Sequence, residues 1–189
     1  MEYIEEQYWE QRYFSGGTSG PGSIGEEKAW KWSIIDQFVP DLNHVIDVGC
    51  GDLSFWEGRD CADYIGIDFS KTVIEKNIKK HPKWQFIHAN AEKRIDGLKK
   101  EVVFCLDVLF HIMDTKTFSK ILKNLCYYST NYIFIHTWNN NPFDKKNQIK
   151  VLPHYLVNLK PIKAINSLKE LLGTSKKKIQ TQNINTFVL

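Results

Sequence analysis

The sequence predicts an α/β fold built on a mainly parallel sheet. Short apolar runs alternate with helical patterns at a regular pitch, and the first strand-like run, VIDV, leads into a glycine turn, GCG, that we expect to open a helix. The chain has 189 residues, of which 42% are hydrophobic and 25% charged, a composition that suits a globular domain with a sizeable core. We therefore expect one domain over residues 1–189, with no linker and no internal repeat.

Two helices are expected before the first strand. They cover residues 4–14 and 26–38, and Pro40 ends the second one. The loop SGGTSGPGS lies between them, and its glycines and proline disfavour regular structure.

Five buried strands are expected next, at residues 44–48, 64–67, 84–88, 102–106 and 132–137. The helices between them should pack on the sheet. Ser70 and Asp114 are the expected N-caps of two of these helices. After Asp114, apolar residues recur at the i, i+3, i+4 and i+7 spacing of a helix face, at Phe118, Ile121, Leu122 and Leu125.

The pattern changes after the fifth strand. WNNNPFDKKNQ reads as a long loop, residues 162–172 as a helix closed by Gly173, and residues 177–189 as two strands joined near Asn183 and Asn185. The complete prediction is a Rossmann-like seven-stranded sheet with five parallel strands plus a C-terminal β-hairpin, covered by helices on both faces.

Composition excludes several classes of protein. No apolar run approaches the roughly 20 residues that span a bilayer, and the N-terminus MEYIEEQYWEQRY has no signal-peptide pattern, so we expect a cytoplasmic protein without a membrane partner. The cysteines show no C-x-x-C pairing, which favours buried thiols over disulfides or a metal site; they are Cys50, Cys61, Cys105 and Cys126.

The net charge of +3 hides an asymmetry between the two ends of the chain. Residues 1–27 hold six Glu and one Arg, whereas residues 145–189 hold nine Lys and one Glu. A basic C-terminal face can attract nucleic acid, but no Arg or aromatic residue is interleaved with the Lys178 cluster, so a solvated surface is the favoured interpretation.

The loop VIDVGCGDLSFW indicates a nucleotide-like ligand. A dinucleotide fingerprint, G-x-G-x-x-G/A, needs a third small residue where this chain has Ser54. Asp52 follows the glycines directly, where its charge would repel a pyrophosphate; it can instead stabilise a helix N-terminus or receive an ammonium group. Both features disfavour a nicotinamide oxidoreductase, which stays the alternative enzyme class.

Polar residues end the next three strands. Asp68 lies 17 residues after Gly51, where a carboxylate can accept both hydroxyls of a ribose. Asn90 follows the third strand, where its amide and the neighbouring backbone can meet an adenine. Asp107 ends the fourth strand. Because carboxyl ends of parallel strands meet at one edge, these residues should surround one ligand that lacks phosphate.

Four stretches, VIDVGCGDLSF, YIGIDFSKTVIEKN, FIHANAEK and VVFCLDVLFHI, resemble the successive motifs of class I S-adenosylmethionine-dependent methyltransferases. The resemblance covers residues 42–138 closely and implies S-adenosylmethionine as cofactor and S-adenosylhomocysteine as product. It places the glycine turn at the methionine part, Asp68 at the ribose and Asn90, in place of the more usual Asp, at the adenine. The implied cofactor-binding residues are Asp47, Gly49, Cys50, Gly51, Asp68, Phe69, Asn90, Ala91 and Asp107. A further glycine that many members carry near Leu53 is absent.

The resemblance implies transfer of a methyl group to a small-molecule acceptor by a monomer or homodimer. Oxygen, nitrogen, sulfur and carboxylate acceptors all stay open, as do a non-catalytic cofactor-binding module and a nucleic-acid or protein methyltransferase. The stretch NNPF is similar to the motif of amino-methylating DNA enzymes, but it follows the fifth strand instead of the fourth, so a turn is the favoured role and nucleic acid is not the expected partner.

Two histidines are candidates for a general base. Transfer from a sulfonium mainly requires alignment and desolvation of the acceptor, and a base is needed only for a hydroxyl or a protonated amine. His111 follows the fourth strand and is the preferred catalytic residue; His136, near the end of the fifth strand, is the alternative. Either can also be a hydrogen-bonded packing residue.

The N-terminal residues 1–25 are expected to form a lid helix and a hinge loop over the core, residues 26–189. The aromatic residues Tyr8, Trp9, Tyr13 and Phe14 precede the glycine-rich loop, and YW-x-x-RY-x-x-GGTSG resembles the start of some small bacterial and archaeal methyltransferases. Tyr13 can attract a sulfonium by a cation–π contact, or it can simply pack on Trp9. The acceptor should lie between this lid, the loop after the fourth strand and residues 138–154.

Overall fold

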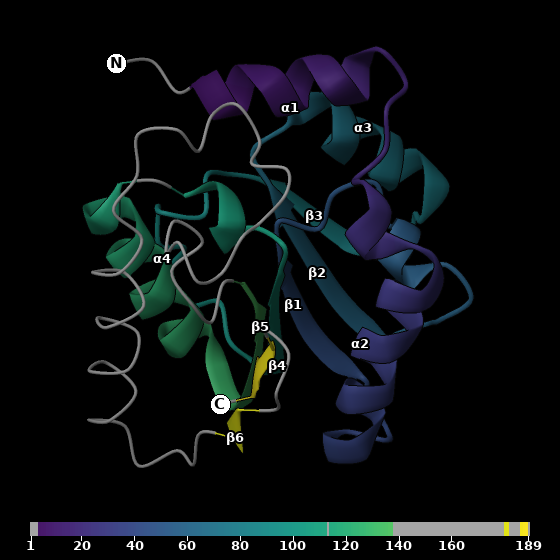
Figure 1. The fold of residues 1–189 in the computed structure, drawn as a ribbon, viewed down its shortest axis with the longest axis vertical. Coiled ribbons are helices and arrows are strands. Elements are labelled where there is room, and N and C mark those ends of the chain that lie inside the picture. Colours follow the sequence, from purple (N-terminus) through teal and green to yellow (C-terminus); the bar gives the residue numbers. More distant parts are fainter. Residues whose placement is uncertain (1–3, 113, 138–179, 182–185, 189) are drawn as a thin grey trace, which may run out of the picture.

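The computed structural model describes residues 4–112, 114–137, 180–181 and 186–188 (Figure 1). Its α-helices are α1 (Ile4–Phe14), α2 (Gly25–Phe38), α3 (Lys71–Lys80) and α4 (Thr115–Tyr128), and its short 3-10 helices are η1 (Pro21–Ser23), η2 (Ser54–Trp56) and η3 (Leu109–His111). Its strands are β1 (His44–Val48), β2 (Asp63–Asp68), β3 (Gln85–His88), β4 (Lys100–Leu106), β5 (Ser129–His136), β6 (Gln180–Thr181) and β7 (Thr186–Val188).

The first five strands form the predicted parallel sheet. Their order is β3-β2-β1-β4-β5, and each neighbouring pair is parallel. The strand order reverses between β1 and β4, so the chain leaves β1 toward one edge and later returns to build the other. In open α/β sheets a ligand binds at such a switch point, outside the carboxyl ends of the strands.

The predicted C-terminal hairpin is described only in part. β7 pairs antiparallel with β5, and β6 pairs antiparallel with β7. The rest of the hairpin, the predicted loop after the fifth strand and the predicted helix at residues 162–172 lie outside the described residues.

Helices cover both faces of the sheet, as predicted: α4 lies on one side in Figure 1, and α2 and α3 lie on the other. Both predicted N-caps are confirmed. The Ser70 hydroxyl accepts from the Val73 N–H at 3.2 Å, and the Asp114 carboxylate accepts from the Thr117 N–H at 2.7 Å. Each cap satisfies a backbone donor that the first helical turn leaves without a partner.

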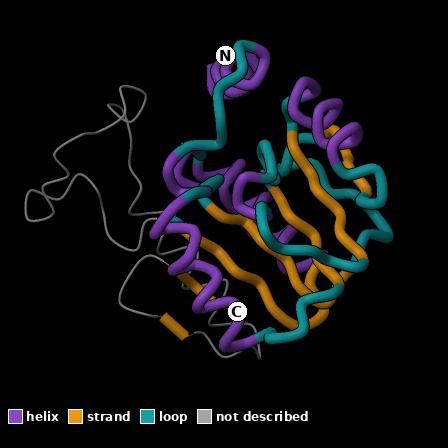
Figure 2. The backbone as a smooth tube through the Cα atoms, turned by 90° about the vertical axis from the view of Figure 1, so that its right-hand side faces the viewer, coloured by secondary structure: helices purple, strands orange, loops and turns teal. Residues whose placement is uncertain are grey.

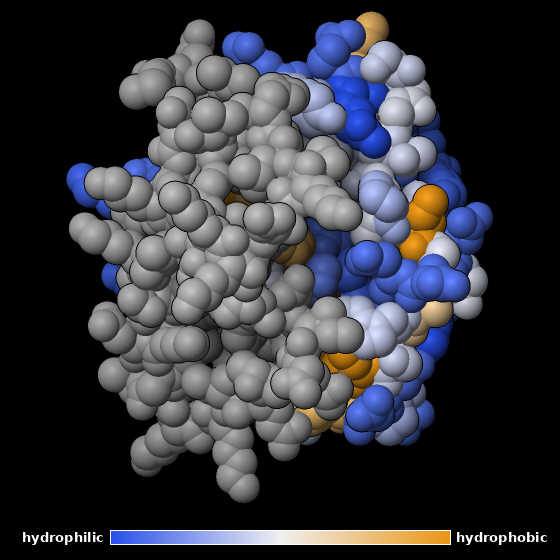
Figure 3. Space-filling model, viewed as in Figure 1, coloured by the Kyte–Doolittle hydropathy of each residue, from blue (hydrophilic) through white to orange (hydrophobic). Residues whose placement is uncertain are grey.

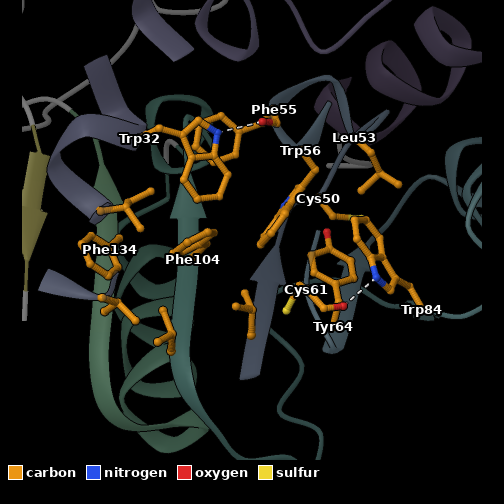
Figure 4. Packing of buried hydrophobic residues seen from close by; sticks show 14 of the residues in the cluster. Trp32, Cys50, Leu53, Phe55, Trp56, Cys61, Tyr64, Trp84, Phe104 and Phe134 are labelled. Carbon is orange, nitrogen blue, oxygen red and sulfur yellow. Dashed lines mark hydrogen bonds between the residues drawn. The ribbon is translucent and has the colours of Figure 1, made fainter. Parts of the chain in front are cut away.

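The two faces of the sheet differ in their side chains. The face under α4, which we call the aliphatic face, is built mainly of Ile, Val and Leu, and it contains the predicted helix stripe Phe118, Ile121, Leu122 and Leu125. The opposite face, which we call the aromatic face, carries Trp32, Phe55, Trp56, Tyr64, Trp84, Phe104 and Phe134 (Figure 4), and Tyr13 belongs to the same cluster. Trp32 stacks on Phe55 with ring centroids 4.7 Å apart, and Trp56 meets Tyr64 edge-on at 4.9 Å.

The connection between β1 and β2 departs from the sequence prediction. The glycine turn was expected to open a helix, and this prediction is wrong: residues 49–62 contain turns and the short helix η2, but no α-helix. Leu53 has φ 64°, in the left-handed region that a continuing right-handed helix cannot use. Phe55 and Trp56 are buried where a crossover helix would otherwise cover the sheet, so aromatic rings replace helix packing here.

Helix α1 lies beyond one end of the sheet, next to α3 (Figures 1 and 2). The large hydrophobic side chains that the described residues expose are Tyr8, Phe14, Ile24 and Ile78. On the face seen in Figure 3, the described surface is mostly hydrophilic with isolated hydrophobic residues. Such scattered residues do not mark a docking patch.

Candidate functional site

A cavity opens at the carboxyl ends of β1 to β4 and beneath α1. Its volume of about 130 Å³ is roughly ten times the 10–15 Å³ that one water molecule needs, so it can admit a ligand. The described residues that line it are Glu6, Trp9, Tyr13, Ser19, Ser23, Asp47, Gly49, Cys50, Phe55, Ile67, Asp68, Phe69, Ala89, Asn90, Ala91, Leu106, Asp107, Val108, His111, Ile112, Thr117 and Ile121. All the candidate site residues except Gly51 and the alternative base His136 are in this lining.

The glycine turn shapes the floor of the cavity. Gly49 has φ 79°, and a Cβ there would lie 2.2 Å from a methyl group of Val108. Gly51 has φ 53°, and a Cβ there would lie 2.2 Å from the Ser19 hydroxyl. Both positions therefore require glycine for backbone conformation and for space.

Asp68 is buried at the end of β2 and bound to the same turn. One carboxylate oxygen accepts from the Gly51 N–H at 3.0 Å and the other from the Ser70 N–H at 2.9 Å. Burial raises the pKa of Asp68 to about 6 and outweighs these two hydrogen bonds, which favour the ionised form. Each oxygen keeps a lone pair that can accept from a ligand hydroxyl.

Asp47 is a second buried carboxyl group of the cavity. Trp56 donates its indole N–H to Oδ2 at 2.8 Å, and the Tyr64 hydroxyl donates to the same oxygen at 3.0 Å. Burial raises the pKa of Asp47 to about 6 despite both bonds. The aromatic face thus holds this carboxyl group in place.

Asp107 is already ion-paired within the chain. It has φ 64°, which is uncommon for a residue with a side chain, and it lines the cavity. Lys31 of α2, with a side chain only 1% exposed, donates to it at 2.5 Å, and the His136 ring is bonded to its other oxygen. Burial alone would raise the pKa of Asp107, but the His136 bond and the Lys31 charge hold that pKa below its ordinary value.

His111 stands on η3 at the wall of the cavity. Its ring meets the Trp9 ring edge-on with centroids 5.3 Å apart, and both residues line the cavity. Burial lowers the pKa of His111 to about 4, against the opposing charge of Asp107. The imidazole is therefore neutral at pH 7.

Helix α1 is fastened to the core close to the site. The Glu10 carboxylate accepts from the Ser70 hydroxyl at 2.5 Å and from the Thr72 hydroxyl at 2.6 Å, so it binds the first turn of α3. Lys76 donates to the carbonyl of Tyr13 at 2.5 Å. These contacts hold α1 over the cavity edge beside Asp68.

The glycine-rich loop is also hydrogen-bonded to the core. Ser19 donates its N–H and its hydroxyl to the Asp52 carboxylate at 3.1 and 2.7 Å. Asp52 also accepts from the Ser54 N–H at 3.0 Å, and it is not among the cavity-lining residues. In this structure Asp52 therefore anchors the loop instead of meeting a ligand ammonium group, while the predicted hinge motion stays a prediction.

Asn90 contacts α1 as well as the end of β3. Its side-chain N–H donates to the Glu6 carboxylate at 2.5 Å, and its side-chain oxygen accepts from the Glu92 N–H at 2.9 Å. Glu6, which lies 84 positions earlier in the chain, thus contacts Asn90, the residue that we expect at the adenine.

The sequence pattern missed several cavity residues that the fold brings in, notably Glu6, Ser19, Ser23, Phe55 and Thr117. The sequence pattern places Trp9 among the aromatic residues of the expected lid but assigns it no role. For Glu6, Ser19 and Ser23 the signal in the sequence was the polar and aromatic content of residues 1–25, which gives no pairing partner, and no sequence signal pointed to Phe55 or Thr117. Among the described residues there is no cluster of three or more His, Cys, Asp or Glu side chains that could hold a metal ion, and no helix long and apolar enough to cross a membrane.

The charged side chains of the cavity suit a cationic ligand. In the described part of the chain its lining has the carboxyl groups of Glu6, Asp47, Asp68 and Asp107 and the neutral imidazole of His111, but no Lys or Arg. A pyrophosphate would be repelled here, whereas a ligand with an ammonium and a sulfonium group would be attracted.

Comparison with known proteins agrees with this chemistry. A family model described as a methyltransferase domain matches residues 46–126, from β1 into α4. No curated protein sequence matches the chain significantly.

Solved structures share the fold. The N-methyltransferase NodS from Bradyrhizobium japonicum, in complex with S-adenosyl-L-homocysteine, has a TM-score of 0.57 and 11% identity over 69% of this chain and 71% of its own. Magnesium protoporphyrin IX methyltransferase from Synechocystis, with bound S-adenosylhomocysteine, has a TM-score of 0.57 and 17% identity over 98% of this chain and 93% of its own. A sugar N-methyltransferase from Streptoalloteichus has a TM-score of 0.54 and 16% identity over 68% of this chain and 53% of its own.

Proposed function

We propose that this chain is a class I S-adenosylmethionine-dependent methyltransferase and that it methylates a small-molecule acceptor. The observation that carries the cofactor assignment is the cavity at the sheet's switch point, whose lining has four carboxyl groups and no described cation. The cofactor, when bound, supplies a methyl group on a positively charged sulfur. The protein residues must bind it, align the acceptor and exclude water.

We assign the ribose hydroxyls to Asp68, next to Phe69, because its buried carboxylate has acceptor capacity beyond its two backbone bonds. The adenine is assigned to Asn90 and Ala91 after β3. The methionine part is assigned to the turn of Gly49, Cys50 and Gly51.

Two further carboxyl groups and one ring complete the proposed cofactor site. Asp47 and Asp107 line the same cavity; Asp47 can place negative charge near the ammonium and sulfonium groups, whereas the charge of Asp107 is balanced by Lys31 and its oxygens act as hydrogen-bond acceptors. Tyr13 offers an aromatic ring to the sulfonium, and burial keeps its phenol protonated because it raises the pKa of Tyr13.

We place residues 1–25 as the lid of a single domain whose core is residues 26–189. The Glu10 and Lys76 contacts hold α1 across the cavity edge in the described part of the chain. A lid in this position would exclude water from the methyl-transfer step.

The small-molecule acceptor is supported by three proteins of similar fold: an N-methyltransferase, magnesium protoporphyrin IX methyltransferase and a sugar N-methyltransferase. The acceptor would approach from the side of Trp9 and His111, where the cavity wall is partly aromatic. Oxygen, nitrogen, sulfur and carboxylate acceptors are all compatible with methyl transfer from a sulfonium.

His111 is proposed to orient the acceptor through its neutral ring. With a pKa of about 4 it is a weak base at neutral pH, so it can accept a hydrogen bond but drives proton removal poorly. The rate should therefore show no inflection from His111 between about pH 6 and 8, where an unperturbed histidine would titrate. An inflection near pH 6.5 that His111→Gln removes would contradict this role.

Two experiments test the proposed function. Isothermal titration with S-adenosylhomocysteine should give saturable binding that Asp68→Ala weakens at least tenfold, because a buried carboxylate bound to two hydroxyls is lost. Asp60→Ala, at an exposed carboxylate between β1 and β2, is the matched control. A screen of hydroxyl, amine, thiol and carboxylate acceptors with labelled cofactor should then identify the methylated atom. Binding of NAD without binding of S-adenosylhomocysteine would overturn the assignment.

A further inference from the structure

Helix α1 brings a carboxylate to the part of the cavity where β3 ends. Glu6 lines the cavity, and its Oε1 accepts from the side-chain N–H of Asn90 at 2.5 Å. Ala91, the next residue, lines the same wall. An acceptor from the N-terminal helix and an amide from the sheet edge therefore form one polar unit.

The amide of Asn90 is already oriented by its own loop. Its oxygen accepts from the Glu92 N–H at 2.9 Å, which leaves the NH2 group directed at Glu6. An aspartate at position 90 would have no donor for Glu6 and would place two carboxylates at hydrogen-bonding distance, where like charges repel. The pairing thus gives a physical reason for an amide at this position.

Glu6 keeps acceptor capacity after binding Asn90. A carboxylate offers about four lone-pair sites, and one of them is used by the Asn90 bond. A ligand amino group has donors only, so it is recognised by such an acceptor and is not recognised by the Asn90 NH2 group. The exocyclic amino group of adenine has this chemistry.

We propose that Glu6 is the acceptor for the exocyclic amino group of the cofactor's adenine, and that Asn90 is a positioning residue that holds Glu6. The inference rests on the proposed placement of adenine beside Asn90. Recognition of the base then depends on the docked position of α1, which Glu10 and Lys76 fasten to the segment that carries Asp68 and α3.

The test compares two ligands that differ only at the adenine amino group. S-adenosylhomocysteine carries the amino donor, whereas its 6-deamino analogue, with purine in place of adenine, carries only hydrogen at C6 and keeps the same ring nitrogens as acceptors. The wild-type protein should prefer the adenosyl ligand by about tenfold or more, as sites built for a donor do. Isothermal titration measures both dissociation constants without needing an acceptor.

Glu6→Ala should weaken S-adenosylhomocysteine binding about tenfold and leave binding of the 6-deamino analogue unchanged, so that the preference falls close to one. Gln7→Ala is the matched control, because this side chain lies on the same helix and is exposed. An unchanged preference in Glu6→Ala would overturn the inference.

A second pair of variants separates an acceptor role from simple packing. Asn90→Asp should weaken S-adenosylhomocysteine binding by charge repulsion with Glu6, and the double variant Glu6→Gln with Asn90→Asp should restore it to within about threefold, since Gln donates to Asp. Failure of this rescue would contradict the proposed pairing of Glu6 with Asn90.

The two proposals fail in different ways. If Asp68→Ala and Glu6→Ala both leave binding unchanged, the placement of the cofactor is wrong. If Asp68→Ala weakens binding while the ligand preference survives in Glu6→Ala, the cofactor placement stands and the role of Glu6 is wrong.

Discussion

The two faces of the sheet are both buried, but they are packed with different kinds of side chain. On the aliphatic face, α4 presents a regular apolar stripe to branched residues of the strands. On the aromatic face, no α-helix follows β1, and the rings of Phe55 and Trp56 fill the space. The aromatic rings also carry polar groups, and Trp56 and Tyr64 use theirs to hold Asp47 at the cavity.

The difference teaches that only one face couples packing to the site. Ile67 and Ile121 of the aliphatic face line the cavity, but the aliphatic side chains outside that lining stabilise the fold by burial alone, so their loss should lower stability without changing the cavity. Aromatic side chains with N–H and O–H groups stabilise the fold and also position a carboxyl group. Matched substitutions should therefore lower the free energy of unfolding on both faces, but they should weaken ligand binding only on the aromatic face.

The largest effect is expected from Trp56→Ala. It removes a fully buried ring from the centre of the aromatic face and one of the two donors to Asp47. The free energy of unfolding should fall by about 3–5 kcal/mol, and S-adenosylhomocysteine binding should weaken in the protein that remains folded. Urea denaturation and calorimetric titration measure the two quantities.

Leu125→Ala is the matched truncation on the aliphatic face. Leu125 is buried under α4 and is not a cavity-lining residue. Unfolding free energy should fall by about 2–4 kcal/mol, because a methyl-rich side chain is lost and a cavity is left. The dissociation constant for S-adenosylhomocysteine should stay within twofold, and a larger change would show that the aliphatic face is coupled to the site as well.

Asp47→Asn should stabilise the protein without ligand at neutral pH. The carboxyl group is protonated in both the folded and the unfolded chain below about pH 4, but above about pH 6 folding must bury it ionised, so stability is lost as the pH rises between these values. A rise of about two pKa units corresponds to roughly 3 kcal/mol. Asn keeps an acceptor for Trp56, so the variant should be more stable at pH 7.5 and equal to wild type near pH 4. Thermal unfolding at both pH values measures this, and an equal gain at both would contradict it.

The smallest effect is expected from removing single hydroxyl groups. Tyr64→Phe deletes a donor to the Asp47 carboxylate and should cost about 2 kcal/mol at pH 7.5, together with a severalfold loss in S-adenosylhomocysteine affinity. Tyr128→Phe on the other face deletes a bond from the Ile95 N–H and should cost about 1 kcal/mol with no change in affinity. Equal affinity losses in the two variants would remove the distinction between the faces.

Much of the fold could be predicted from local pattern. Hydrophobic periodicity located the five parallel strands and the helix stripe of α4, and polar residues located the caps at Ser70 and Asp114, because these features depend on neighbours in the sequence. The helix expected after Gly51 failed for a tertiary reason. Asp52 binds Ser19, Phe55 stacks on Trp32 of α2, and Trp56 meets Tyr64 of β2, so contacts distant in the sequence hold this segment in a non-helical conformation.

The sequence by itself determined that the glycine turn, Asp68, Asn90 and Asp107 lie at strand ends, since strand periodicity and residue type are local. Only the tertiary structure decided which charges they meet. Lys31 neutralises Asp107, and Glu6 faces Asn90, across 76 and 84 positions of chain. Such pairings depend on the direction of each crossover and on where α1 docks, and neither is encoded in the spacing of a motif.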